Sequence, residues 1–130
     1  MNYNFPICRD RIRTIPEQFS WVDHRLVRDR HIELLSHEAA ALYLFLVTVA
    51  DCQGLSYYSD VSICERLTMD TATLAAARIC LSKAGLVVYK KPLYQVLSLG
   101  VRTVDLKKRS VSEKSMAISE TFKGLAGGVR

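Results

Sequence analysis

Cysteine and histidine side chains are the groups in this sequence that could hold a metal ion or exchange electrons. The cysteines are Cys8, Cys52, Cys64 and Cys80. No pair has the short spacing of a zinc site, and the histidines do not complete one. Cys64 and Cys80 lie among apolar residues, where a thiol behaves as a small hydrophobic group. We therefore expect free thiols in a reducing compartment and no metal or cofactor, with a zinc site or a disulfide as the alternatives.

Catalytic combinations of side chains are not apparent either. Asp23 and His24 are neighbours, so on an extended chain their side chains point to opposite sides. His31 and His37 lie in polar stretches, where surface positions without a catalytic partner are expected. The glycines of segment 124–128 lack the spacing of a phosphate-binding loop and follow no predicted strand. These observations predict that the chain is not an enzyme.

Basic side chains are concentrated towards the C-terminus of the chain. Basic and acidic residues number six and five in 1–35, five and five in 36–99, and seven and three in 100–130. Lys107, Lys108 and Arg109 form the densest cluster. Lysine and arginine bind anionic polymers because each contact with a phosphate releases a counterion. The cluster therefore indicates an anionic partner, with a simply solvated tail as the alternative.

Composition indicates a single packed domain. The chain has 130 residues, of which 49% are hydrophobic. The longest apolar run, 39–50, is broken only by Thr48 and is shorter than the roughly 20 residues that a bilayer requires. Residues 1–14 carry three arginines without an apolar stretch behind them, so no secretory signal is expected. We expect a soluble cytoplasmic protein with no membrane partner.

The elements that would position the basic groups begin with a helix over residues 37–51. Ser36 is a suitable N-cap, and Glu38 suits the helix dipole. Apolar residues surround this helix almost completely, which is typical of a helix buried on more than one side. It must then lie at the centre of the core or form part of a dimer surface, so a homodimer is a further prediction.

A pair of helices and a hairpin are predicted next. A short β-prone segment at 55–58 precedes a helix capped by Ser59 or Asp60. Thr68 and Met69 form a tight turn, and Asp70 caps a third helix through about Ala84. Gly85 ends that helix, and two strands at 86–89 and 93–99 flank the turn at 90–92.

Three regions follow from this assignment. Residues 1–35 form an N-terminal arm that packs on the core through Phe19 and Trp21. Residues 36–99 form the main domain. Residues 100–130 form a basic tail in which Ile118, Phe122 and Leu125 have helical spacing, so the tail could include a short helix from about Ser112 to Ala126.

The order helix, strand, helix, tight turn, helix, hairpin resembles a winged helix-turn-helix domain. The segments that carry the resemblance are 36–46, 81–87 and 94–99, and together the arrangement covers about half of the chain. It is similar to the N-terminal modules of plasmid replication initiators and primosomal proteins, and to small helix-turn-helix proteins of mobile elements. The resemblance implies a mainly α fold with a small β-hairpin (α+β). It also implies binding of double-stranded DNA in replication, transposition or transcription control.

In winged helices of this kind the outward face of the third helix enters the major groove. With Leu74, Ala77 and Leu81 facing inward, the resemblance implies that hydroxyl, methyl and guanidinium groups on this helix read or clamp DNA. The wing lysines and the tail cluster would bind phosphates. The predicted DNA-binding residues are Thr71, Thr73, Ala75, Ala76, Arg78, Ser82, Lys90, Lys91, Lys107, Lys108 and Arg109.

The third helix departs from the usual pattern of DNA readers, because it carries one arginine among small residues. Small side chains allow close approach but discriminate poorly between bases. Arg78 also falls where related helices often carry a core leucine. The alternative function is therefore an adaptor: the same fold docking on a replication or recombination protein.

Overall fold

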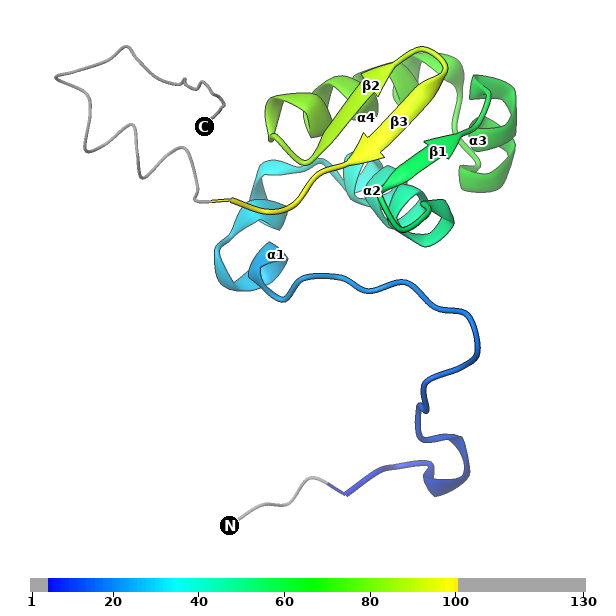
Figure 1. Ribbon diagram of the computed structural model, residues 1–130, viewed down its shortest axis with the longest axis vertical. Coiled ribbons are helices and arrows are strands. Elements are labelled where there is room, and N and C mark those ends of the chain that lie inside the picture. The colour runs from blue at the N-terminus through cyan, green and yellow to red at the C-terminus, as the bar shows by residue number, and fades with distance from the viewer. Residues whose placement is uncertain (1–4, 101–130) are drawn as a thin grey trace, which may run out of the picture.

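The computed structural model describes residues 5–100, which form a mainly helical α+β fold with a small antiparallel sheet (Figure 1). The predicted fold class is confirmed. The elements in chain order are the 3₁₀ helix η1 (Arg9–Arg11), α1 (Arg25–Arg28), the 3₁₀ helix η2 (His31–Leu34), α2 (His37–Val49), β1 (Leu55–Tyr57), α3 (Asp60–Leu67), α4 (Thr71–Lys83), β2 (Val87–Lys90) and β3 (Leu93–Val96). No helix within residues 5–100 is long and apolar enough to cross a bilayer.

Side-chain caps start the three long helices where the sequence predicts them. The Ser36 hydroxyl accepts a hydrogen bond from the Ala39 N–H at 3.1 Å. Ser59, rather than Asp60, caps α3. The Asp70 carboxylate accepts from the Thr73 N–H at 2.7 Å, and hydrogen bonds with the Thr73 hydroxyl and N–H lower the pKa of Asp70. Each cap satisfies a backbone donor that the helix itself leaves unpaired.

A tight turn joins α3 to α4. Thr68 adopts the left-handed conformation at φ 55°, and the Met69 N–H donates to the Cys64 carbonyl at 3.1 Å. Asp70 then caps α4 immediately. At the other end of α4, Gly85 at φ 76° ends the helix in a conformation that glycine adopts without strain. Local hydrogen bonds and backbone conformations therefore fix both the start and the end of α4.

The sheet has three strands in the order β1-β3-β2, one more than the predicted hairpin. The hairpin pairs Val87 with Val96 and Lys90 with Leu93. On its other edge β3 pairs with β1. The chain before β1 approaches β3 so closely that a Cβ on Gly54 would lie 2.5 Å from the Val96 carbonyl oxygen, which only glycine avoids.

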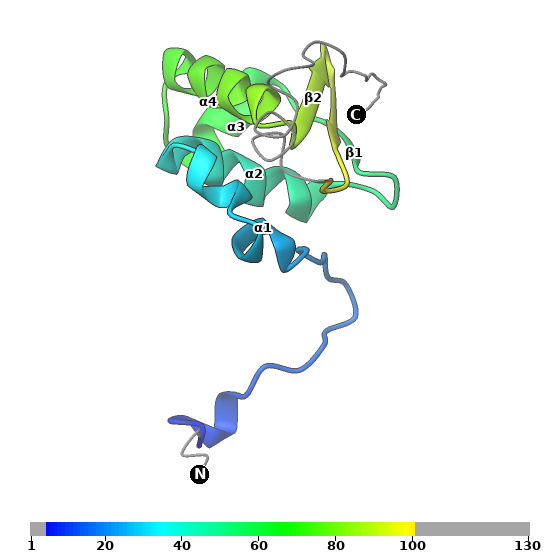
Figure 2. The same cartoon turned by 90° about the vertical axis from the view of Figure 1, so that its left-hand side faces the viewer.

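The core lies between α2, α4 and the sheet. Leu42 and Leu46 of α2, Leu74 and Leu81 of α4, and Tyr94 of β3 are fully buried. In Figure 2 the three long helices lie on one side of the sheet. Leu44 is 61% exposed, so one face of α2 lies open to solvent, and a dimer surface on that face stays a prediction.

The predicted packing of Phe19 and Trp21 on the core is only loose, because both residues lie beside Tyr43 of α2 but remain 62% and 74% exposed. Residues 5–18 are exposed throughout, and Figures 1 and 2 show them running away from the body. Only the segment from Asp23 onward packs closely, through Leu26 and His31, which are buried. The main domain therefore begins before residue 36. The predicted tail helix from Ser112 to Ala126 lies outside the described residues.

Candidate nucleic-acid interface

The face of α4 opposite the core forms a stripe of small and aliphatic side chains. Residues advance by about 100° along a helix, so positions 72, 76, 79 and 83 lie on one line. These residues are Ala72, Ala76, Ile79 and Lys83, and all four are exposed. Ile79 is 56% exposed although it is a large aliphatic residue. We call these four residues the α4 stripe.

The predicted contact residues of α4 only partly coincide with this stripe. Ala76 belongs to it, and Thr71 and Ser82 are exposed beside it, whereas Thr73 and Ala75 are half-buried. Thr73 lines a shallow depression between α4 and the start of α2, where Glu38 is also found. The contribution of these residues to DNA binding stays a prediction.

Sequence reasoning missed Ala72, Ile79 and Lys83 of the stripe. Their position directly opposite Leu74, Ala77 and Leu81 on the helical wheel was available from the sequence. The residue type of Ile79 instead predicts a core position, because large aliphatic residues are usually buried.

Arg78 does not point outward, and its predicted position on the open face is wrong. Its side chain is 17% exposed. The guanidinium donates to the Tyr94 hydroxyl at 2.7 Å and to the Asp60 carboxylate at 3.0 Å. It also lies 4.3 Å from the centre of the Tyr89 ring, within range of a cation–π contact. Arg78 therefore joins α4 to α3 and to both strands of the wing.

The charge of Arg78 is stabilised in this position. Burial lowers its pKa, but the hydrogen bonds with Asp60 and Tyr94 outweigh burial, and the pKa lies above its ordinary value. Burial raises the pKa of Tyr94, so its hydroxyl stays protonated at neutral pH. The rings of Tyr89 and Tyr94 lie 4.4 Å apart and connect the two strands on this face. We call Arg78, Asp60, Tyr89 and Tyr94 the Arg78 cluster; it connects α4 with α3 and the wing.

The lysines at the tip of the wing are exposed to solvent. Lys90 ends β2, Lys91 follows it with a cis peptide bond to Pro92, and both lysines are exposed. Within residues 5–100, no ion pair involves Lys83, Lys90 or Lys91. Three exposed cationic groups on α4 and the wing thus form no ion pair with another group of residues 5–100. The predicted phosphate contacts of Lys107, Lys108 and Arg109 lie outside the described residues.

The possible metal ligands and thiols of the described residues are placed as follows. No group of three histidine, cysteine, aspartate or glutamate side chains there could hold a metal ion. The four cysteines are free thiols; Cys8 and Cys52 are exposed, and Cys64 and Cys80 are half-buried. His37 is exposed as predicted, but His31 is buried, because η2 folds it against the body.

Comparison with known proteins gives limited information. No protein-family model matches the chain, and no curated protein shows significant similarity to it. One solved structure, described as "Structure of Rep-DNA complex", is similar to it with a TM-score of 0.48 and 17% identity over 77% of this chain and 90% of that one. A likeness this remote assigns neither a family nor a function.

Proposed function

We propose that this chain is a winged-helix protein that binds double-stranded DNA with α4 in the major groove and the β2–β3 wing against the phosphate backbone. The observation that supports this most is an exposed α4 stripe beside lysines that form no ion pair in the part of the chain that the structure describes. A helix that follows a tight turn and projects from its domain is the element that reads the major groove in proteins of this architecture.

Small side chains and cations have separate roles in this proposal. Methyl groups of Ala72, Ala76 and Ile79 would contact thymine methyls, and the Thr71 hydroxyl would bond a base edge or a phosphate. Lys83, Lys90 and Lys91 would bind phosphates, which position a protein but carry little sequence information. Since Arg78 is engaged internally, we propose that it positions the wing and makes no base contact.

Our proposal for the biological process rests on the resemblance of the sequence to winged helix-turn-helix domains and not on the geometry of the α4 stripe and the wing. We propose a binding role without catalysis in replication initiation, transposition or transcription control of a mobile element. The arrangement of a compact reading helix and a basic wing suits any of these processes, since all require a protein to find a short duplex site.

The wing lysines provide the first test. Fluorescence anisotropy with mixed-sequence duplexes is measured for the full chain at about 50 mM and about 200 mM salt, and binding should weaken steeply with salt. Lys90→Ala should weaken binding about fivefold and reduce the salt slope by about one. Arg28→Ala removes an exposed charge from α1, where Arg28 lies 3.9 Å from Asp29, and should change neither quantity. Flat titrations at low salt, or equal losses in both variants, would refute the proposal.

The α4 stripe provides the second test, because it offers a matched pair of exposed aliphatic residues on helices. Ile79→Glu places a carboxylate on the stripe and should reduce affinity at least about tenfold by repulsion from phosphates. Leu44→Glu makes the same change on the outer face of α2, where Leu44 is 61% exposed, and should leave affinity unchanged. Normal binding by Ile79→Glu would exclude α4 from the interface.

A protein adaptor is the second candidate, favoured by the apolar character of the α4 stripe. Exposed aliphatic residues that gather on one face often mark a protein-binding surface. Pull-down from the native host would then recover one replication or recombination protein in stoichiometric amount and no nucleic acid. Loss of that protein with Ile79→Glu, together with flat DNA titrations, would select the adaptor.

A further inference from the structure

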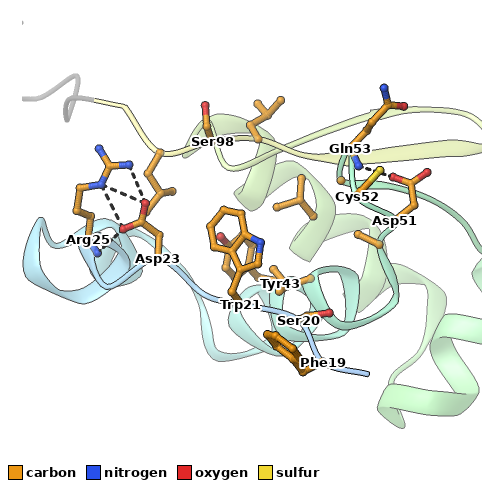
Figure 3. Close-up of a pocket in the computed structure, with 16 residues that line it drawn as sticks. Phe19, Ser20, Trp21, Asp23, Arg25, Tyr43, Asp51, Cys52, Gln53 and Ser98 are labelled. Atoms are coloured by element: carbon orange, nitrogen blue, oxygen red, sulfur yellow. Dashed lines mark hydrogen bonds and ion pairs between the residues drawn. The ribbon is translucent and has the colours of Figure 1, made fainter. Parts of the chain in front are cut away.

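A groove with aromatic walls lies beside the second half of α2, and the proposed function does not use it. Its volume is about 560 Å³. The groove lies between the segment before α1, the second half of α2 and the chain that follows β3, and Phe19, Trp21 and Tyr43 project into it (Figure 3). We call it the aromatic groove. Tyr43 is buried, whereas Phe19 and Trp21 are 62% and 74% exposed, so two large rings lack a cover.

Two carboxylates accompany these rings. The Arg25 side chain bonds Asp23 at 2.7 Å and lowers the pKa of that carboxyl to about 2, so Asp23 is ionised. Asp51 accepts hydrogen bonds from the backbone N–H groups of Gln53 and Leu55 and remains exposed. Ring faces and carboxylates both attract guanidinium groups. Arg25 also lines the groove and already pairs with Asp23, so Asp51 is the carboxylate with which a second guanidinium can pair. The groove therefore fits an apolar segment that also carries positive charge.

Residues 5–18, which we call the distal arm, have this composition. Phe5, Ile7, Ile12 and Ile15 are all exposed, and Ile7 reaches 105%. Three arginines, at positions 9, 11 and 13, lie between these apolar residues, and the acidic groups of the arm are Asp10 and Glu17. Both ribbon views show the distal arm extending away from its own body (Figures 1 and 2). Exposed apolar residues gathered on one segment are uncommon in a monomer and mark a contact surface.

We propose that the distal arm of one copy of this chain lies in the aromatic groove of a second copy, and that the exchange is reciprocal about a two-fold axis. Apolar side chains then cover Phe19 and Trp21, and an arginine of the arm meets Asp51 of the second copy. Fourteen arm residues and the 16 groove residues make about 30 residues a side, the size of a standard stable interface. A two-fold arrangement lets the same two surfaces serve both copies.

Trp21 is the only tryptophan in the chain, so its fluorescence reports whether the groove is covered. Sedimentation equilibrium and tryptophan emission are measured on the full chain without DNA over a dilution series. At high concentration we expect a dimer with blue-shifted emission. On dilution the emission should shift to red at the concentration at which the mass falls to that of a monomer.

Variants separate this exchange from other dimers. Ile7→Asp combined with Ile15→Asp should raise the dimer dissociation constant at least about 30-fold, the loss expected for a hot spot of about 2 kcal/mol, with red emission throughout. Leu44→Asp changes an exposed aliphatic residue outside both the arm and the groove, and it should leave the dimer intact.

Three results would overturn the proposal. The first is a wild-type chain that stays monomeric at high concentration. Its emission would be red if the groove is uncovered, and blue if the arm folds into the groove of its own chain. The second is a dimer that the arm substitutions leave unchanged. The third is a dimer that Leu44→Asp dissociates. Because no DNA is present, each of these results leaves the DNA-binding proposal standing.

Discussion

The α4–wing unit and the distal arm differ in how completely their side chains are satisfied. Leu74, Ala77 and Leu81 of α4 are buried, and Arg78 bonds both Tyr94 and Asp60. By contrast, residues 5–18 are exposed throughout. Near the base of the arm, the Ser20 hydroxyl donates to the Thr48 carbonyl at 3.2 Å, a single exposed hydrogen bond.

This difference separates stability from recognition. A unit whose polar groups are paired inside the domain holds its shape before it meets a ligand, which suits a rigid reading surface. A segment whose apolar groups find no cover within one chain contributes little to folding. Its apolar surface becomes useful only in a complex. The two regions should therefore respond oppositely to substitution.

Arg78→Ala should produce the largest loss of stability, about 3 kcal/mol in the free energy of unfolding. The substitution leaves the buried Tyr94 hydroxyl without its donor and removes the contact over Tyr89. Urea unfolding followed by circular dichroism measures the change. Arg78→Lys should recover only part of the loss, because an ammonium group lacks the planar fork. A loss below about 1 kcal/mol would show that the Arg78 cluster does not hold the wing.

Ser36→Ala should cost about 1 kcal/mol, because it removes the hydroxyl that accepts from the Ala39 N–H at the start of α2. The same urea titration applies. Ser82→Ala is the control, since Ser82 is an exposed residue late in α4 and caps no helix. Equal effects of the two substitutions would mean that the cap makes no specific contribution.

Ile7→Ser in the distal arm should change the free energy of unfolding by less than about 0.5 kcal/mol in dilute solution. Ile7 is fully exposed and covers nothing in its own chain. Here the measurement must be made below the concentration at which copies associate. A clear loss in the monomer would show that the arm packs on its own body, and the contrast between the regions would disappear.

The smallest effect on stability is expected from the ion pair between Asp23 and Arg25, which should be lost only at low pH. Because the pKa of Asp23 falls from 3.8 to about 2 in the fold, its stabilising contribution is complete above pH 4 and is lost as the pH falls through 2. An NMR titration of the Asp23 carboxyl gives the midpoint directly. Arg25→Gln should return that midpoint towards 3.8, and an unchanged midpoint would assign the shift to another group.

Much of the domain was predictable because its signals are local. Ser36 and Asp70 start helices through bonds to backbone groups three residues away, and Gly85 ends α4 by its own conformation. These effects depend on neighbours along the chain, so α2, α3, α4 and the hairpin appear in the sequence. The interface was less predictable. The position of the stripe followed from helical geometry, but the exposed Ile79 resembles a core residue in composition.

Sequence alone therefore determined the order of the helices and the wing, together with the lysines at its tip. Tertiary structure alone decided that β1 joins the sheet, that Trp21 stays exposed, and that Arg78 turns inward. The partners of Arg78 lie 16 and 18 residues away along the chain. Contacts over such separations depend on how whole elements pack, and a pattern of neighbouring residues does not encode which distant groups a flexible side chain will reach.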